Sequence, residues 1–349
     1  MNAPPLLATG DPALLEDLLR LAAAASTPVE TARTVDRALR LWPRAPLVVL
    51  GTDLQGFLRG SDPPPHPRFV VVGRPGSPPA AGGAAPMLLP RDESALAGML
   101  ARAGTARPAA PSVSVVGGRG GAGASILCVA LALAAGRSGR SAALIDADPF
   151  GCGPDLYLGQ SVEPKQQTGW HDLVERRGRV HWRDLGEGLP GTAGVSVLTW
   201  ARDPGRPRSP LPADAARAAL ASARYGTDLV VADLPRWLGA AGTALLNRSD
   251  LALLVVPAEV PAVVAAHALV PRLRKEAPQV RAVVRGASGE LTADVVARSL
   301  GVPLAADLPA EPGLERLLAA GRVPADHPRS PLARFSDHLV SSLLAEAAR

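Results

Sequence analysis

The sequence predicts two consecutive α/β domains, each built around a mainly parallel sheet. Apolar runs of strand length alternate with segments whose apolar residues recur at helical spacing, which is the pattern of repeated βα units. Of all residues, 47% are hydrophobic but only 3% are aromatic, so we expect cores of the small aliphatic side chains that fill helix-covered parallel sheets. With 349 residues, the chain is long enough to bury two such cores.

The first domain is expected over residues 1–104, as a small doubly wound sheet of the flavodoxin-like type. Its predicted elements, in chain order, are a strand at 5–9, helices at 12–24 and 34–41, strands at 46–50, 69–73 and 87–89, and a helix at 93–103. The first helix is indicated by one apolar face that carries Leu14, Leu15, Leu18 and Leu19. Residues 103–111 mix Gly, Thr, Arg and Pro without periodicity, which predicts a linker at 105–111.

In its order of elements this domain resembles the receiver domains of response regulators. Receivers carry an acidic pair after the first strand, a phosphoacceptor Asp at the end of the third, and a Lys before a Pro after the fifth. The corresponding places here hold Gly10 and Asp11, then Gly51 with Asp53 two residues later, and Leu89 before Pro90. We therefore expect a pseudo-receiver that makes protein contacts and does not transfer phosphate.

The second domain is expected over residues 112–349, where the repeating units become longer. Strands are predicted at 113–117, 142–146, 195–200, 228–233, 251–256 and 280–285, and helices at 123–135, 213–224, 261–275, 291–300, 313–320 and from about 332 to 347.

A glycine-rich turn joins the first strand of this domain to its first helix. It consists of Gly118, Arg119, Gly120, Gly121, Ala122, Gly123, Ala124 and Ser125. Backbone N–H groups in such a loop, together with the start of the helix, form a site for phosphate, and the hydroxyl of Ser125 suits Mg²⁺. The P-loop pattern has a Lys at the position of Ala124, and that Lys bridges the β- and γ-phosphates. We therefore expect ATP or ADP with Mg²⁺ to bind weakly or not at all.

Acidic residues end two of the predicted strands. Asp146 and Asp148 are two residues apart and point to the same side, toward the phosphate pocket. One of them could act through the metal shell while the other positions an attacking water, or they could instead cap a turn. Asp233 ends an apolar strand in the manner of a Walker B segment, whose carboxylate binds Mg²⁺ through water.

Together these segments resemble the MinD/ParA family of P-loop ATPases over essentially all of residues 112–349. The resemblance implies that Asp148 activates water if any ATP is hydrolysed, that Asp146 and Asp233 lie near the metal, and that the protein forms a homodimer. The family has a signature Lys that crosses the dimer to the partner's phosphates, and Arg119 stands at its position. The family's adenine-binding Asn, expected near residues 284–286, is absent.

A pseudo-receiver ahead of a MinD-like domain is the layout of the CpaE/TadZ branch, and the composition is closest to the actinobacterial CpaE-like or septum-site-determining (Ssd) group. This resemblance implies a spatial regulator in septum-site determination that works through protein contacts, with weak or absent ATP hydrolysis. The alternatives are a localisation factor for Flp/Tad pilus or secretion machinery, an active ATPase in which an Arg replaces the missing Lys, and a ParA-like protein that binds DNA.

The composition constrains partners and location. The net charge is +5, but only Lys165 and Lys275 among the 37 basic residues are lysines, so the charge is weak evidence for nucleic-acid binding. Cys128 and Cys152 lack the spacing of a redox or zinc site. We therefore expect a cytoplasmic protein without a structural metal. The family resemblance implies in addition that partners recruit it to the septum or pole.

Two further surfaces are candidates for partners. Residues 175–184 combine several Arg residues with Trp182, a pattern that can contact DNA phosphates or form a solvated loop. The last helix carries an apolar stripe that includes Leu332, Leu339 and Leu343. Because Asp337 and Glu346 offset its basic residues, we expect this stripe to pack on the domain and not to bind a membrane surface.

Overall fold

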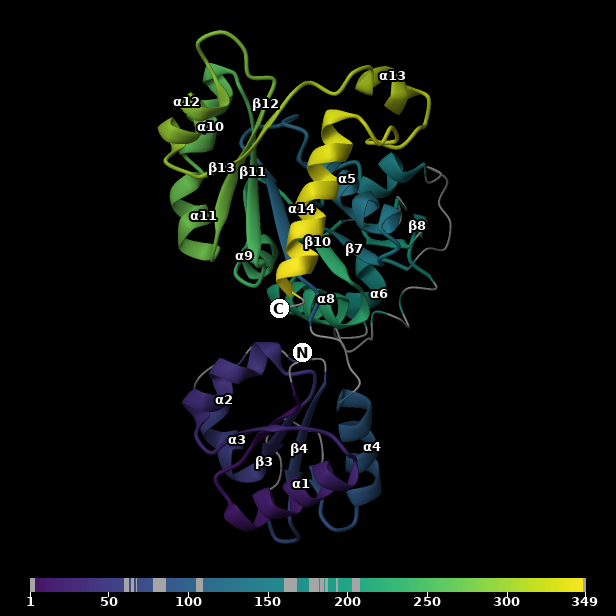
Figure 1. The fold of residues 1–349 in the computed structure, drawn as a ribbon, viewed down its shortest axis with the longest axis vertical. Coiled ribbons are helices and arrows are strands. Elements are labelled where there is room, and N and C mark those ends of the chain that lie inside the picture. The colour runs from purple at the N-terminus through teal and green to yellow at the C-terminus, as the bar shows by residue number, and fades with distance from the viewer. Residues whose placement is uncertain are drawn as a thin grey trace. The chain divides into compact units, whose positions relative to one another are not determined.

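The computed structural model describes residues 4–347 except 60–62, 64–65, 67, 78–85, 105–108, 160–167, 176–181, 183–184, 186–187, 193 and 203–207. It divides into two compact units, Met1–Ala109 and Ala110–Ala347 (Figure 1). Most of the linker predicted at 105–111 lies outside the described residues, as does most of the basic segment at 175–184.

The N-terminal unit is a five-stranded parallel sheet with the strand order β2-β1-β3-β4-β5. Its strands are β1 (Leu6–Ala8), β2 (Glu30–Ala32), β3 (Val48–Gly51), β4 (Phe69–Gly73) and β5 (Met87–Leu88). Its helices are α1 (Pro12–Ala24), α2 (Val35–Leu41), the 3-10 helix η1 (Trp42–Arg44), α3 (Thr52–Arg59) and α4 (Glu93–Gly104). The doubly wound architecture is therefore confirmed.

Helix α1 begins where the sequence predicts, because Asp11 caps it. The Asp11 carboxylate accepts hydrogen bonds from the backbone N–H groups of Ala13 and Leu14. Leu14 and Leu18 are buried in the core of the unit. Leu19, which we expected on the same face, is 41% exposed and belongs to the opposite edge of the helix.

The C-terminal unit is an eight-stranded sheet with the order β13-β12-β11-β6-β10-β7-β9-β8, in which only β8 runs antiparallel. Its strands are β6 (Ser112–Gly117), β7 (Ala142–Asp146), β8 (Gly191–Thr192), β9 (Val195–Leu198), β10 (Leu229–Leu234), β11 (Leu251–Pro257), β12 (Val280–Arg285) and β13 (Leu304–Leu308). Since β6, β10 and β7 are parallel neighbours, their carboxyl ends meet at one edge of the sheet.

Helices cover both faces of this sheet and bury two cores. On one face lie α5 (Ala124–Arg137) and α14 (Pro331–Ala347), and on the other lie α6 (Trp170–Glu175), α8 (Ala213–Gly226), α9 (Ala240–Leu246), α10 (Val260–His267), α11 (Val270–Glu276) and α12 (Ala293–Leu300). The remaining short elements are the 3-10 helix η2 (Pro154–Leu158) and α13 (Leu314–Ala319). Alternate residues of β11 show the two-sided burial, since Leu253 packs with α5 and Leu254 with the opposite helices.

One predicted helix of this unit is wrong in its extent. The segment expected as a single helix at 261–275 forms α10 and α11, which are separated at Ala268 and Leu269. Pro271 lies in the first turn of α11, where its missing N–H is tolerated, but inside a continuous helix it would remove a backbone hydrogen bond.

The last helix packs against α5, along which it runs in Figure 1. Leu332, Leu339 and Leu343 are buried in the shared core, as expected, and Arg137 pairs with Asp337 at 2.6 Å. Among the described residues, no helix combines the length and apolar character needed to cross a membrane.

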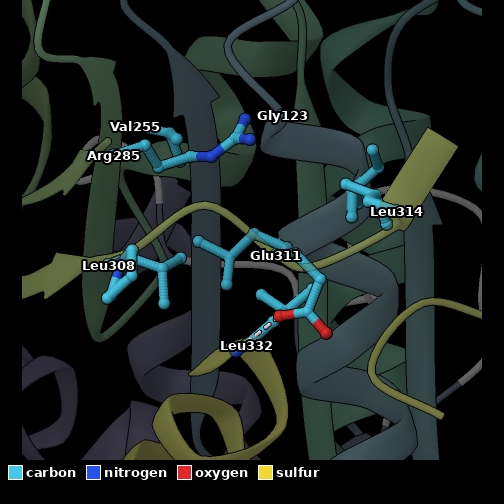
Figure 2. Close-up of a pocket in the computed structure, with 10 residues that line it drawn as sticks. Gly123, Val255, Arg285, Leu308, Glu311, Leu314 and Leu332 are labelled. Carbon is cyan, nitrogen blue, oxygen red and sulfur yellow. Dashed lines mark hydrogen bonds between the residues drawn. The ribbon is translucent and has the colours of Figure 1, made fainter. Parts of the chain in front are cut away.

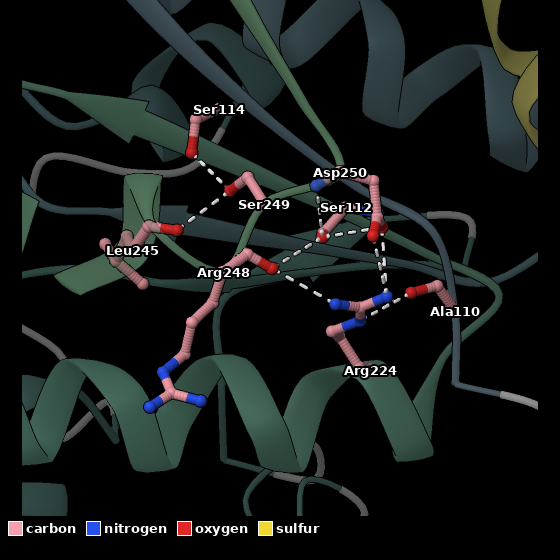
Figure 3. Close-up of polar contacts among 8 residues, drawn as sticks. All are labelled: Ala110, Ser112, Ser114, Arg224, Leu245, Arg248, Ser249 and Asp250. Atoms are coloured by element: carbon pink, nitrogen blue, oxygen red, sulfur yellow. Dashed lines mark hydrogen bonds and ion pairs between the residues drawn. The ribbon is translucent and has the colours of Figure 1, made fainter. Parts of the chain in front are cut away.

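A polar cluster fixes the start of the C-terminal unit (Figure 3). The backbone N–H of Ala110 donates to the carbonyl of Arg224, and the Nε of Arg224 donates back to the carbonyl of Ala110 at 2.8 Å. The Arg224 guanidinium also pairs with Asp250 at 2.9 Å, and Asp250 in turn accepts from both the backbone N–H and the hydroxyl of Ser112. The first residues of β6 are thereby tied to α8 and to the residue before β11.

Candidate functional site

The glycine-rich loop Gly118–Ser125 lies between β6 and α5, as the sequence predicts. Gly121 and Gly123 have φ angles of +70° and +93°, which side chains other than glycine rarely adopt. Gly118 donates its N–H to the carbonyl of Val255 at 2.8 Å, and a Cβ at Gly118 would lie only 2.9 Å from that of Ala266. The loop is therefore packed closely against β11 and α10, with the N-terminus of α5 at its end.

Arg119, at the signature position of the loop, is held within its own chain. Its guanidinium forms an ion pair with both oxygens of Glu259, at 2.9 and 3.0 Å, and donates to the carbonyl of Gly120 at 2.9 Å. Its Nε is buried and has no hydrogen-bond acceptor. The hydrogen-bonding capacity of the Arg119 side chain is thus only partly used.

Asp146 and Asp233 lie side by side at the ends of β7 and β10, where they are paired in register. Their side chains are almost fully buried, with 2% and 4% of each residue exposed. Burial, with the charge of Asp233 next in importance, raises the pKa of Asp146 from 3.8 to about 8. Burial likewise raises the pKa of Asp233 to about 6, although Ser125 and Cys128 act against this rise by hydrogen bonding. Two buried carboxyls close together favour a bound cation or a proton.

Hydrogen bonds fix the position of Asp146. Its Oδ2 accepts from the hydroxyl of Thr199 at 2.6 Å, and its Oδ1 accepts from the backbone N–H of Asp148 at 3.0 Å. Its carbonyl accepts from the indole N–H of Trp170, also at 2.6 Å. Neither Thr199 nor Trp170 was predicted, since nothing in the local pattern links them to the end of β7.

Asp148 forms part of a tight turn beside this acidic pair. Its Oδ1 accepts the backbone N–H of Phe150 at 3.0 Å, and its carbonyl accepts that of Gly151. Arg208 fastens the same turn by donating to the carbonyls of Pro149 and Gly151. Phe150, at the tip, is 85% exposed. The contacts of the Asp148 carboxylate are those of a residue that caps a turn, which is one of the two alternatives given above.

Arg285 is the site residue that sequence reasoning missed. It ends β12, at the place where we looked for an Asn, and its guanidinium extends to the glycine-rich loop (Figure 2). There Nη1 donates to the carbonyl of Ala122, and a Cβ on Gly123 would overlap the same nitrogen. Ala122 and Arg285 are 163 residues apart in the sequence, so only the absence of the Asn could have drawn attention to this position.

A pocket opens beside this contact. Arg285 lines it together with Gly123, Glu311 and a wall of aliphatic side chains that includes Leu308, Leu314 and Leu332 (Figure 2). The carboxylate of Glu311 points away from Arg285 and accepts the backbone N–H of Leu332 at 3.0 Å, at the start of α14.

In the N-terminal unit, Asp53 lies in the first turn of α3, two residues after the place of the receiver phosphoacceptor. The chain has glycine at position 51, and the Asp53 carboxylate fills the space that a side chain there would take. Its two oxygens accept from the hydroxyl of Thr9 at 2.8 Å and from the backbone N–H of Gly10 at 2.7 Å. These hydrogen bonds fix the Asp53 carboxylate against the residues that follow β1.

The residues around the loop fit Mg²⁺ and phosphate in part. Ser125, Asp146 and Asp233 offer the oxygen donors that Mg²⁺ prefers, and the buried acidic pair would be stabilised by a divalent cation. The loop supplies backbone N–H groups for phosphate, but Ala124 supplies no charge. Among the described residues, no three His, Cys, Asp or Glu side chains gather as a self-sufficient metal site.

Comparisons with known proteins agree with this architecture. Residues 8–111 match the family model described as "Rv3660c-like, CheY-like N-terminal domain", and residues 110–277 match the model described as "Cellulose biosynthesis protein BcsQ". Protein Rv3660c of Mycobacterium tuberculosis, described as uncharacterized, is 42% identical over 210 residues, which are 60% of this chain and 57% of that protein.

Solved structures show the same fold for the C-terminal unit. A ParA family ATPase from Chlorobium tepidum TLS has a TM-score of 0.58 at 16% identity, covering 67% of this chain and 98% of that one. The MinD cell division protein of Aquifex aeolicus has a TM-score of 0.52 at 20% identity, covering 68% and 98%. The predicted fold class is confirmed: a CheY-like N-terminal domain precedes a ParA/MinD-like P-loop domain with a mostly parallel sheet.

Proposed function

We propose that this protein is a spatial regulator of the MinD/ParA type, which acts through protein contacts and has negligible ATP hydrolysis. The observation that carries the proposal is Ala124, because the loop lacks the lysine that would stabilise charge on the transferred phosphate. The contacts of Asp148 support it, since its carboxylate accepts the N–H of Phe150 within a turn. Its surroundings differ from those of a free base facing an attacking water.

In this mechanism a nucleotide is a structural ligand. Mg²⁺, when bound, would neutralise phosphate oxygens and the acidic pair; Ser125, Asp146 and Asp233 are the residues that would hold it. The backbone of Gly120–Ser125 would bind and orient the phosphates. Phe150, which is exposed beside this site, would contribute to the homodimeric surface that is presented to partner proteins.

The process we propose is septum-site determination, in the manner of the septum-site-determining group of the CpaE/TadZ branch, with a cytoplasmic protein recruited to the septum or pole. One similar solved structure is a "MinC:MinD cell division protein complex" from Aquifex aeolicus, which supports a role through protein partners. The second candidate is localisation of pilus or secretion machinery, because a receiver-like domain ahead of a MinD-like domain is also the layout of the CpaE/TadZ branch. Cell length after deletion of the gene tests the first role, and assembly of surface pili tests the second.

Steady-state ATP hydrolysis tests the proposal directly. We expect the full chain with Mg²⁺ to show no rate above that of the Asp148→Ala variant. An intact MinD protein serves as the positive control, and light scattering on the same samples reports dimer formation. A rate close to that of the MinD control, abolished by Asp148→Ala, would establish the ATPase alternative in its place.

A further inference from the structure

The glycine-rich loop leaves space at Gly123 for the guanidinium of Arg285. The guanidinium lies where a side chain on residue 123 would be, so glycine at that position admits it. It is held by one hydrogen bond, from Nη1 to the carbonyl of Ala122. Most of its donor capacity is left for something else, because a guanidinium has five N–H groups.

This cation is not neutralised by the protein. Arg285 is half-buried, and no carboxylate among the described residues pairs with it. The nearest acidic side chain lining the pocket, Glu311, bonds instead to the backbone of Leu332. Burial, and after it the charge of Arg119, lowers the pKa of Arg285. Two positive side chains thus lie beside one loop, and within the part of the chain that the structure describes they have one ion-pair partner, Glu259, which binds Arg119.

Arg119 adds an independent sign that an acceptor is missing. Its Nε is buried without a hydrogen-bond partner, although both of its terminal nitrogens have acceptors. A buried donor without an acceptor is costly and uncommon in folded proteins, and a bound ion or ligand that accepts from it is one way to complete it. Like charges and unfilled donors beside backbone N–H groups are together the features of an anion site.

We propose that Arg285 supplies, from the end of β12, the positive charge that the loop lacks at Ala124, and that it binds a phosphate group of a nucleotide. This inference rests on the proposed function, because it uses the same loop. It names the ligand chemistry as a nucleoside di- or triphosphate, bound through its phosphates. Arginine suits this task because it stays charged when half-buried and can bind two oxygens at once.

The contrary role for Arg285 is that of a lock, in which the guanidinium bonds to Ala122 to keep phosphate out. The two roles predict opposite effects of removing the side chain. Arg285→Ala weakens nucleotide binding if Arg285 is a phosphate ligand, and strengthens it if Arg285 is a lock.

The test is calorimetric titration of the full chain with ATP and Mg²⁺, ADP and Mg²⁺, pyrophosphate, and adenosine. We expect the di- and triphosphates to bind and adenosine not to bind. Arg285→Ala should weaken binding about tenfold to a hundredfold, as the loss of one charge-assisted hydrogen-bonding group implies. Arg285→Lys should restore part of the affinity. Arg281→Ala is the matched control on the same strand, at an exposed residue, and should leave affinity unchanged.

A second variant keeps the test decisive if Arg285→Ala alone is ambiguous. Adding Ala124→Lys to Arg285→Ala should recover binding, because the charge then comes from the loop. Unchanged or tighter binding by Arg285→Ala, with an unaltered melting temperature, would overturn the inference. So would failure of the parent to bind any phosphate. Neither result touches the proposed absence of ATP hydrolysis, which is overturned only if ATP is hydrolysed in dependence on Asp148. Failure of the parent to bind any phosphate would in addition remove the structural role that the proposed function gives to the nucleotide.

Discussion

At the scale of single residues, the buried pair Asp146 and Asp233 makes the stability of the protein depend on pH. Because the folded state raises both pKa values, it binds more protons than the unfolded chain between about pH 4 and pH 8. The free energy of unfolding therefore decreases as the pH rises through this window. Below it both carboxyls are protonated in either state, and above it the full cost of burying charge is present.

Replacing Asp146 by Asn should remove most of this dependence. The amide oxygen can still accept the backbone N–H of Asp148, while the buried charge is lost. We expect Asp146→Asn, without metal or nucleotide, to gain about 1–3 kcal/mol over the parent at pH 8 and to differ little at pH 4. Urea denaturation at several pH values measures this, with the exposed Glu290→Gln as control. An equal effect of Asp146→Asn at both pH values would contradict the assignment.

Asp53 should not accept a phosphoryl group. Both of its oxygens accept hydrogen bonds from the residues that follow β1, Thr9 and Gly10, and the acidic pair that holds Mg²⁺ in receivers is represented here by Gly10 and Asp11. Asp11 is itself occupied as the cap of α1. Incubation of the protein with acetyl phosphate and Mg²⁺, followed by intact-mass spectrometry, should reveal no added phosphate. A single adduct that disappears in Asp53→Asn would refute the pseudo-receiver interpretation.

At the scale of elements, the packing of α14 on α5 carries much of the stability of the C-terminal unit. Leu339 is buried in that contact, so Leu339→Ala leaves a cavity and should cost about 2–4 kcal/mol. Ser341, two residues further along the same helix and exposed, gives the control Ser341→Ala, which should change stability by less than about 0.5 kcal/mol. Urea denaturation separates the two. Equal, small effects would mean that α14 is not part of the folded core.

Elements with strong local patterns could be predicted from the sequence, whereas those defined by their neighbours could not. Helix α1, with its Asp cap and apolar face, and strand β12 have the predicted bounds. The short β2 and the partly exposed β13 were missed because both lie at sheet edges and carry polar residues that obscure the pattern. The helix expected at 261–275 shows the opposite failure, since its apolar spacing continues across the break before Pro271.

The candidate site divides in the same way. The loop and the three Asp residues could be predicted because they lie at the ends of successive parallel strands, which must meet at one edge. The contact of Arg285 with Ala122 depends on the direction in which the long Arg285 side chain extends from the end of β12. The hydrogen bond from Thr199 to Asp146 depends on which strand lies beside β7. Side-chain contacts of this kind have no local periodicity.

At the scale of the whole molecule, the two compact units should unfold separately. Each has its own sheet and its own cores. We expect two transitions in calorimetry, of which only one, assigned to residues 110–347, shifts when ATP and Mg²⁺ are added. The isolated fragment from residue 109 onward should reproduce the shifting transition. One cooperative transition that moves as a whole would mean that the units are thermodynamically coupled.

The hydrogen bonds between Ala110 and Arg224 also determine at which residues the chain should tolerate truncation, fusion or insertion. Their loss would free Ala110, two residues before β6, from α8, and β6 leads directly to Gly118. An insertion immediately before Ala109 should therefore leave β6 in place, while an insertion between Ala110 and Ser112 would displace the strand and the nucleotide site with it. An insertion of the first kind should therefore leave the affinity for nucleotide unchanged, and one of the second kind should lower it.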